Sequence, residues 1–402
     1  MKRILSISSI LICLSISSFG ATYDAVVDFG ANPSDNGGND TTYLQNAINT
    51  VCAQGGGTLY IPEGVYEVTK LVLPSSGNQD ITIKGDGDSA SIIRARDSQN
   101  VIDFDFNSID DNLIIEDITI QSRSSGNSGI AIDVSYPLYT STTNSNHEHF
   151  GFVANRVHID SRYNFASGTG YFTAGIKVSN AWNTRITNCI ISGWKRTQAN
   201  TRGIYFADSC INSLVQGCSI NFVERGLDFE VSSSGNLQHE GIKVDNCEIV
   251  DVKYGLKVDS STAGNVAFWI TLTNSHVDAR GSNAACVKLE SASQCFIKDN
   301  LLYLSAALYG FHFLGYDVTN SQISNNVLVT DNYPLSGGFM LHSGCGHNII
   351  SNNNFINAQY AAIRLTSNTY YNHVSDNVLQ PQAVLNIQDQ GISNNLVDNI
   401  KF

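Results

Sequence analysis

Acidic side chains recur at matching positions of short apolar runs in the middle of the chain. Asp228 and Glu230 lie two residues apart in the run 226–230, and Asp259 ends a similar run at 255–259. Every second side chain of a β-strand points to the same side, so we expect all three carboxylates on one outward face. Carboxylates held this close disfavour joint ionisation, and glycoside hydrolysis uses one protonated and one ionised carboxyl group. We therefore predict Asp228, Glu230 and Asp259 as catalytic residues of an endo-acting glycoside hydrolase that cleaves a polysaccharide.

Three other interpretations of this face stay open. The face could be a solvated charge ladder, in which Lys257 and Lys288 neutralise acids of neighbouring strands. It could belong to a polysaccharide lyase, where a base removes a proton beside a uronate carboxylate and a cation neutralises that carboxylate. Hydrolysis would need no cofactor and we predict no metal ligands, whereas Ca²⁺ could bind the acids of a lyase. It could also belong to a carbohydrate-binding or adhesive protein without catalytic activity.

Candidate substrate-binding residues surround the acids. They are basic, aromatic or imidazole side chains that can contact a sugar by charge, hydrogen bonds or ring stacking: Lys177, Trp182, Trp194, Arg202, Tyr205, Arg225, Lys257 and His312. Aligning the runs on their glycines predicts one outward column of Ala131, Lys177, Tyr205, Asp228, Lys257, Lys288, His312, Met340, Arg364 and Asn386. The neighbouring column is predicted to contain Asp133, Glu230, Asp259, Glu290 and Leu314.

Loops on the N-terminal side of Asp228 add further candidates. Trp182 and Trp194, with Tyr163, Tyr171 and Phe172, are expected to flank the strand of Asp228 on one side, whereas Trp269 is expected in the core. His147-Glu148-His149 lacks the spacing of a zinc peptidase, and is either a loop that supplies an acid or base or a solvated loop.

A repeat of near-constant period must position these residues. It is marked by Ile186-Thr187-Asn188-Cys189 and eight similar copies, the last being Ile392-Ser393-Asn394-Asn395, at spacings of 18 to 29 residues. Each copy is too small to bury its own apolar face, so the copies must stack. The pattern predicts a solenoid of about 11 or 12 coils, in which Asn suits a bend with positive φ and its amide can bond the next coil.

An amphipathic helix precedes the repeats. Asp40 is predicted to cap it, and apolar residues follow at helical spacing: Leu44, Ala47, Ile48, Val51 and Cys52. The glycines 55–57 end it.

This N-terminal part resembles a known group of proteins. The runs Val27-Asp28-Phe29-Gly30-Ala31, Gln45-Asn46-Ala47-Ile48 and Gly55-Gly56-Gly57-Thr58 resemble the opening of the pectate-lyase-like superfamily, which includes rhamnogalacturonases, carrageenases and mannuronan epimerases. The resemblance implies an all-β protein, a right-handed parallel β-helix whose N-terminal end is capped by the helix. Residues 226–256 also resemble coils of phage tailspike depolymerases, which are trimeric. The combined Asp-Asp and Gly-His-Gly motifs of polygalacturonases and the Asp-Pro-His-Glu motif of mannuronan epimerases are absent.

The ends, the charge and the cysteines constrain location and partners. Lys2 and Arg3 precede an apolar run and a small-residue cleavage site, so residues 1–20 are predicted to be a signal peptide. Residues 21–402 are then one secreted β-helix domain, extracellular or periplasmic, with residues 21–70 as its N-terminal cap region. No other stretch could span a membrane.

Without Lys2 and Arg3, 21 basic residues face 36 acidic ones. That balance disfavours a nucleic-acid partner and leaves a polysaccharide, bound by a monomer or a homotrimer. Cys189, Cys218 and Cys247 share one repeat position, which allows either a disulfide or a ladder of buried thiols.

Overall fold

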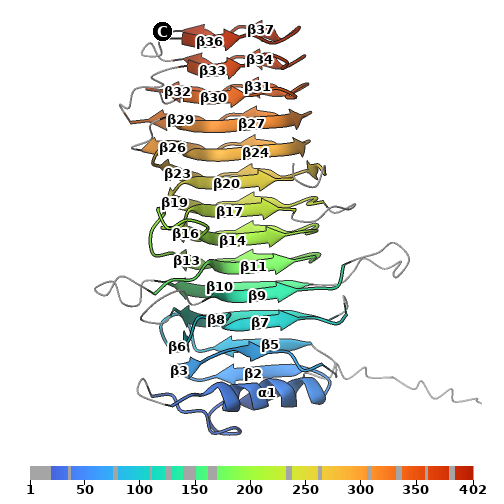
Figure 1. Ribbon diagram of the computed structural model, residues 1–402, viewed down its shortest axis with the longest axis vertical. Helices are drawn as coiled ribbons and strands as arrows, with labels where there is room; N and C mark the ends of the chain where they lie inside the picture. Colours follow the sequence, from blue (N-terminus) through green and yellow to red (C-terminus); the bar gives the residue numbers. More distant parts are fainter. Residues whose placement is uncertain are drawn as a thin grey trace, which may run out of the picture.

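The computed structural model describes residues 20–34, 38–75, 80–108, 111–122, 129–138, 151–161, 170–231, 238–260, 265–305, 309–331, 337–357, 361–379 and 385–401. The predicted signal peptide up to residue 19, the triplet His147-Glu148-His149, and Tyr163 lie outside these ranges. The described chain winds into a right-handed parallel β-helix whose coils stack from the N-terminal helix to the C-terminus (Figure 1).

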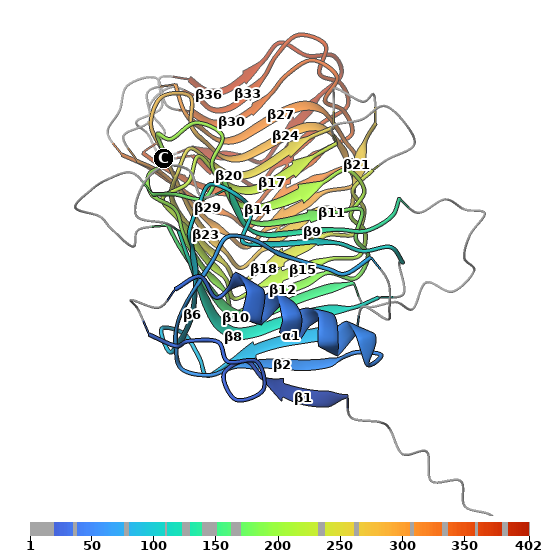
Figure 2. The ribbon, with the colours of Figure 1, turned by 60° about the horizontal axis from the view of Figure 1, so that its bottom comes forward.

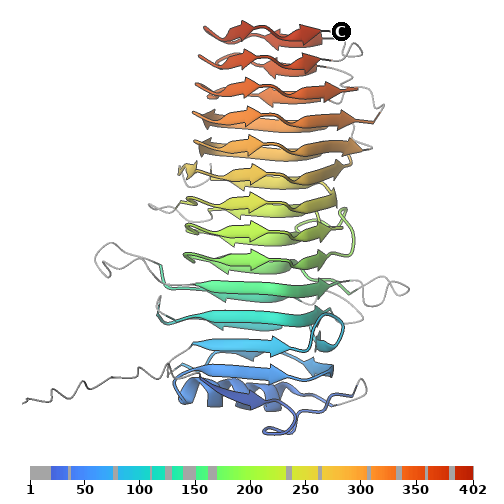
Figure 3. The ribbon, with the colours of Figure 1, turned by 180° about the vertical axis from the view of Figure 1, so that it is seen from behind.

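Each full coil contributes two strands to a large sheet of 25 strands and one strand to a small sheet of 13 (Figure 3). The first row of the large sheet contains β1 (Ala21–Asp24), β2 (Gly57–Ile61), β5 (Ile81–Gly85), β8 (Leu113–Gln121), β10 (Phe152–Asp160), β12 (Arg185–Thr187), β15 (Leu214–Gln216), β18 (Lys243–Asp245), β22 (Thr271–Thr273), β25 (Phe296–Lys298), β28 (Gln322–Ser324), β31 (Ile349–Ser351), β34 (His373–Ser375) and β37 (Asn395–Val397). The second row contains β3 (Gly64–Val68), β6 (Ser91–Ala95), the second halves of β8 and β10, β13 (Ile190–Ser192), β16 (Ser219–Asn221), β19 (Glu248–Val252), β23 (His276–Arg280), β26 (Leu301–Ser305), β29 (Val327–Thr330), β32 (Asn354–Ile356), β35 (Val378–Leu379) and β38 (Ile400–Lys401).

The small sheet forms the face that the sequence indicated for chemistry. Its strands are β4 (Leu71–Val72), β7 (Ile102–Asp105), β9 (Ile130–Ser135), β11 (Ala174–Ser179), β14 (Arg202–Ala207), β17 (Arg225–Glu230), β20 (Tyr254–Asp259), β24 (Ala285–Ser293), β27 (Phe311–Thr319), β30 (Gly337–Leu341), β33 (Ala361–Leu365) and β36 (Leu385–Asp389), with β21 (Ala267–Phe268) paired beside β24. These twelve stacked strands of the described chain agree with the expected 11 or 12 coils.

The helix α1 (Thr41–Ala53) covers the N-terminal end of the solenoid (Figure 2). It buries all five predicted apolar residues: Leu44, Ala47, Ile48, Val51 and Cys52. Asp40 precedes α1 but makes no side-chain capping bond. Its buried carboxylate instead accepts hydrogen bonds from the backbone N–H groups of Asn32 (2.8 Å) and Glu67 (3.2 Å). The predicted cap residue therefore ties the N-terminal loop to β3.

Asn has two different functions at the bend between the two rows of the large sheet. In the first eight copies the third residue, such as Asn188 or Asn325, has positive φ, and the side chains of these two are exposed. The ninth copy was assigned wrongly, because Ile392 pairs with Tyr370 at another corner and Leu396 to Asn399 occupy this bend. The fourth residue of the first eight copies is buried, and in four of them it is Asn. With Asn399 of the last coil, which is half-buried, these residues form a ladder in which each amide bonds the next: Asn300, Asn326, Asn353, Asn377 and Asn399. A ladder of this kind satisfies polar backbone inside an otherwise apolar core.

Cysteines occupy the same buried position in earlier coils. Cys189, Cys218 and Cys247 stack there, and Ser275 joins this row to the Asn ladder by accepting a bond from the N–H of Cys247 (3.1 Å). All three are free, so the ladder of buried thiols is the alternative that the structure supports. Among the helices of the described ranges, none has the length and apolar character needed to cross a bilayer.

Candidate active site

The outward side of β11, β14, β17, β20 and β24 carries most of the predicted site residues, and we call it the charged face. Pairing along the small sheet puts Lys177, Tyr205, Asp228, Lys257 and Lys288 in one outward column. The next column contains Ala207, Glu230, Asp259 and Glu290. The stripe of acids beside a stripe of mainly basic residues, expected from the sequence, is therefore present between β17 and β24.

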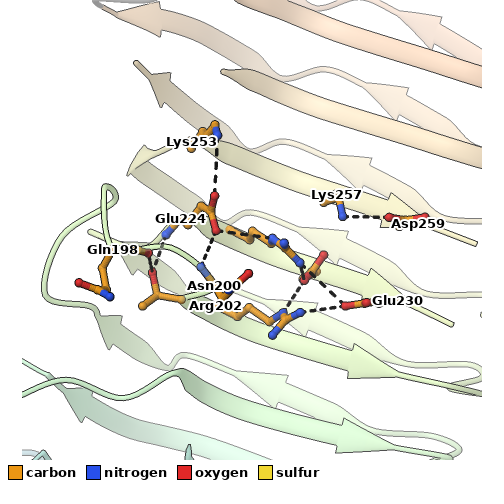
Figure 4. Close-up of polar contacts among 11 residues, drawn as sticks. Gln198, Asn200, Arg202, Glu224, Glu230, Lys253, Lys257 and Asp259 are labelled. Atoms are coloured by element: carbon orange, nitrogen blue, oxygen red, sulfur yellow. Dashed lines mark hydrogen bonds and ion pairs between the residues drawn. The ribbon is translucent and has the colours of Figure 1, made fainter. Parts of the chain in front are cut away.

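Asp228 is buried beneath two arginines at the centre of the face. Its side chain is 0% exposed, and Oδ2 accepts bonds from Arg202 Nε (2.6 Å) and from Arg225 Nη1 (2.8 Å). Figure 4 shows that Arg202 also reaches Glu230. The other oxygen, Oδ1, is buried without a hydrogen-bond partner. A carboxylate enclosed in this way presents no oxygen at the surface, and its bonds hold Arg202 and Arg225 in position.

Glu230, Asp259 and Glu290 differ from Asp228 because they are partly exposed. Their side chains are 31%, 22% and 20% exposed and lie in register on β17, β20 and β24. Each has a basic partner: Arg202 Nη2 bonds Glu230 (2.8 Å), Lys257 bonds Asp259 (3.1 Å) and Lys288 bonds Glu290 (2.8 Å). The two lysines pair with the acid of their own strand and not with that of a neighbouring coil.

The charge states of two neighbours limit the chemistry. Burial raises the pKa of Tyr205, with Glu230 adding to the effect. Burial lowers the pKa of Lys288, but the hydrogen bond and charge of Glu290, together with Tyr254 and Tyr316, outweigh burial and the net shift is upward. Both groups therefore keep their protons at neutral pH and are poor general bases. Arg202 lies over the Tyr205 ring at 4.2 Å, which holds its guanidinium on the face.

His312 is not on the charged face. Lys288 pairs with Leu314, so the sequence alignment of β27 was wrong by two residues, and Tyr316 follows Glu290 in the acid column. His312 lies where other coils have the corner glycines 203, 226 and 255, is 1% exposed, and bonds the carbonyl of Val329 (2.9 Å). Burial lowers its pKa to about 4. The same two-residue error affects β9, where Asp133, not Ala131, pairs with Lys177, and β36, where Gln388, not Asn386, pairs with Arg364.

The predicted aromatic residues lie at opposite edges of the small sheet. Trp182 follows β11, whereas Trp194 precedes β14, so they do not flank Asp228 together. The rings of Tyr171 and Trp194 stack with their centres 6.0 Å apart and their planes at 14°. Lys195 Nζ lies 3.7 Å from the centre of the Trp194 ring, so little of the surface of that ring is left for a sugar. Phe172 is buried. Trp269, expected in the core, is 48% exposed.

The small sheet carries a second group, of which the sequence placed His342 and Arg364 in outward columns but missed Tyr316, and none of the three was predicted as a site residue. Tyr316 and His342 stack at 4.2 Å, and Arg364 lies two strands beyond Leu314. Burial and then Arg364 lower the pKa of His342, so its imidazole is neutral at pH 7. A correct alignment of β27 would have placed Tyr316 beside Glu290.

Lys177, also predicted to bind substrate, pairs with Asp133 (3.1 Å), whose pKa is raised by burial. In the ranges that the structure describes, no group of three or more His, Cys, Asp or Glu side chains is arranged to hold a metal ion.

Comparison with known proteins identifies the family. The model of the rhamnogalacturonase A/epimerase, pectate lyase-like family matches residues 24–257, more than half of the chain. The chain belongs to this family. A second model, of the periplasmic copper-binding protein NosD, matches residues 229–400.

Individual relatives are similar over different lengths. An iota-carrageenase of Alteromonas macleodii is 32% identical over 103 residues, which are 23% of this chain and about a fifth (21%) of that protein. The A-module of a mannuronan C-5 epimerase of Azotobacter vinelandii superposes with a TM-score of 0.60 at 16% identity, over 94% of this chain and 99% of that one. An alpha-1,3-glucanase catalytic unit of Streptomyces thermodiastaticus gives a TM-score of 0.62 at 13% identity, over 93% and 68%. The matched family and these three relatives are polysaccharide-acting β-helix proteins. The structural similarity confirms the fold.

Proposed function

We propose that this protein is a secreted, endo-acting glycoside hydrolase that cleaves a polysaccharide on the charged face, with Glu230 and Asp259 as the reacting carboxyl groups. The observation that carries the proposal is the in-register, partly exposed row of Glu230, Asp259 and Glu290 on successive strands. One acid would protonate the glycosidic oxygen while its neighbour attacks the sugar or activates water. The family match and the carrageenase likeness support the substrate class. The predicted signal peptide and the periplasmic NosD model support secretion.

The basic residues of the face have a supporting function in this mechanism. Asp228 binds both Arg202 and Arg225 and so fixes their positions, and Lys257 forms an ion pair with Asp259. With Lys177 and Tyr205 they line the path of the substrate and would bind its hydroxyl or anionic groups. Hydrolysis in this form uses no cofactor.

Product analysis on a panel of polysaccharides tests the reaction. We expect new reducing ends without the ultraviolet absorbance of an unsaturated sugar. Glu230→Gln and Asp259→Asn should each lower kcat by roughly 10²- to 10⁴-fold. Glu290→Gln is the matched control, because it changes the third acid of the row and should keep most of the activity. Full activity in both Glu230→Gln and Asp259→Asn would refute the assignment.

Elimination from a uronate-containing polysaccharide is the second candidate. The neutral imidazole of His342 beside Arg364 would supply a base and a cation to neutralise the carboxylate. Unsaturated products that disappear in His342→Gln but persist in Glu230→Gln would favour this lyase reaction. Binding without any turnover would favour an adhesive protein.

A further inference from the structure

Each coil crosses a narrow facet between the small sheet and the first row of the large sheet. Parallel bridges run along this facet from Trp182 through Ile211 and Glu240 to Phe268, and from Thr319 through Gly346 and Tyr370 to Ile392. In Figure 2, β21 marks the facet at the edge where strands of the small sheet end. The facet is therefore a separate surface that runs beside the small sheet from the coil of Trp182 to the coil of Ile392.

The residue after each bridge turns the corner in a left-handed backbone conformation. These residues, which we call the corner column, have φ between 51° and 67°: Asn183, Asn212, Gly241, Trp269, Gln294, Asn320, His347, Tyr371 and Ser393. Gly and Asn adopt this conformation readily, whereas bulky residues rarely do. Trp269 and Tyr371 are therefore unusual occupants of positions that other coils fill with Asn, Gly, Gln or Ser, and His347 adds a third ring to the column.

Packing does not explain these three rings. Trp269 is 48% and Tyr371 58% exposed, and His347 is also exposed, so little apolar surface is buried in return for the unfavourable backbone. His347 stacks on Tyr371 at 5.3 Å and 23°, and Tyr370 lies edge-on to both. Gly346 makes room for this group, because a Cβ there would lie 2.2 Å from the Tyr370 ring. Backbone strain kept without burial indicates an external ligand.

The composition of the column indicates which ligand. From Trp269 to Ser393 it contains rings, amides and a hydroxyl, but no carboxylate, Lys or Arg. Rings suit the apolar C–H faces of sugars, and amides suit their hydroxyl groups. Positions recur about every 4.8 Å along the axis, which is comparable with the length of one sugar residue in a chain.

We propose that the corner column from Trp269 to Ser393 is a second carbohydrate-binding site, which holds a polysaccharide along the solenoid axis outside the charged face. Its ligand class rests on the proposed function. A polymer held there has a raised effective concentration at the charged face. Oligosaccharides too short to occupy both surfaces gain nothing from it.

The double variant Trp269→Asn/Tyr371→Asn tests this site. Asn adopts the left-handed backbone conformation of this column more readily than Trp or Tyr. The variant should therefore unfold at the same temperature as the parent or at a higher one. We expect roughly tenfold or more loss of polysaccharide binding in affinity electrophoresis, with cleavage of short oligosaccharides unchanged. Tyr309→Asn is the matched control, since Tyr309 is also exposed (51%) with positive φ (60°) but lies outside the column.

Three results would overturn the proposal. They are unchanged polysaccharide binding in the double variant, an equal loss in Tyr309→Asn, or a lower unfolding temperature together with lost oligosaccharide cleavage, which would make the rings structural. Failure of the proposed hydrolase is distinguishable: a parent that binds polysaccharide without cleaving it, and a double variant that loses this binding, would support the second site and refute the hydrolase.

Discussion

Asp228 and Glu230 lie two residues apart on β17 but have different environments. Asp228 is enclosed by Arg202 and Arg225. Glu230 forms a close ion pair with Arg202 (2.8 Å), and its side chain is 31% exposed. A buried charge depends on its partners, because removing one partner leaves the others desolvated and uncompensated. Residue type and strand alternation predicted both as outward acids, but they could not predict that two arginines would cover one of them.

Asp228→Asn should therefore destabilise the protein more than it changes the chemistry of the exposed acids. We expect a loss of about 3–5 kcal/mol in the free energy of unfolding, since Arg202 and Arg225 would lose their shared counter-ion. Glu290→Gln, which breaks the more exposed pair with Lys288, should cost about 1 kcal/mol or less. Urea denaturation measures both values. Equal stability of the two variants would contradict the proposed function of Asp228 as an anchor for the arginines.

At the scale of strands, the sequence predicted most of the small sheet correctly and failed at β9, β27 and β36. Glycine marks the inward corner of β11, β14, β17 and β20, where a Cβ would collide with a neighbouring Ile or Val. In β9 and β27 the corner is Ala131 and His312, and in these strands and in β36 a nearby glycine or apolar residue suggested another alignment. In β24 and β33 the corner is Cys286 and Ala362, but there the alignment was correct. Alternation alone cannot correct a two-residue slip, because it leaves every side chain on its original side.

The Asn ladder gives the large sheet its own prediction. Asn326 accepts bonds from the backbone N–H (3.1 Å) and side-chain amide (3.0 Å) of Asn300, and donates to the carbonyl of Ile297 (2.9 Å). Asn326→Ala should cost at least about 3 kcal/mol, because it leaves several buried polar groups unpaired.

The adjacent Asn325 provides a control within the same bend. It is exposed with φ 58°, a conformation that glycine adopts readily. Asn325→Gly should therefore unfold within about 1 kcal/mol of the parent. Chemical denaturation of the two variants checks whether the third repeat residue only forms the bend while the fourth stabilises the core by hydrogen bonds. A larger loss in Asn325→Gly than in Asn326→Ala would contradict it.

At the scale of the whole molecule, the repeat period was enough to predict a stacked solenoid, because each coil buries its apolar residues only against its neighbours. The helix cap followed from a single amphipathic stretch. The period did not predict the facet, because the segments that bridge there are too short to show an alternation of apolar and polar residues. Trp182 was consequently expected beside the strand of Asp228 and Trp269 in the core, although the facet bears both residues.

Two buried histidines couple the stability of the whole solenoid to pH. His239 is 0% and His312 1% exposed, and burial lowers the pKa of each from 6.5 to about 4. The unfolded chain therefore binds more protons than the folded one between these values, so stability is fully present above about pH 6.5 and is lost as the pH falls toward about 4. Each imidazole contributes about 3 kcal/mol to this loss. His239→Phe should flatten the acid arm of a stability–pH curve from urea denaturation, because a Phe ring takes up no proton and the His239 ring already packs edge-on against Phe229 (5.8 Å). An unchanged slope between pH 6.5 and 4 in this variant would show that His239 takes up its proton without unfolding the coil around it.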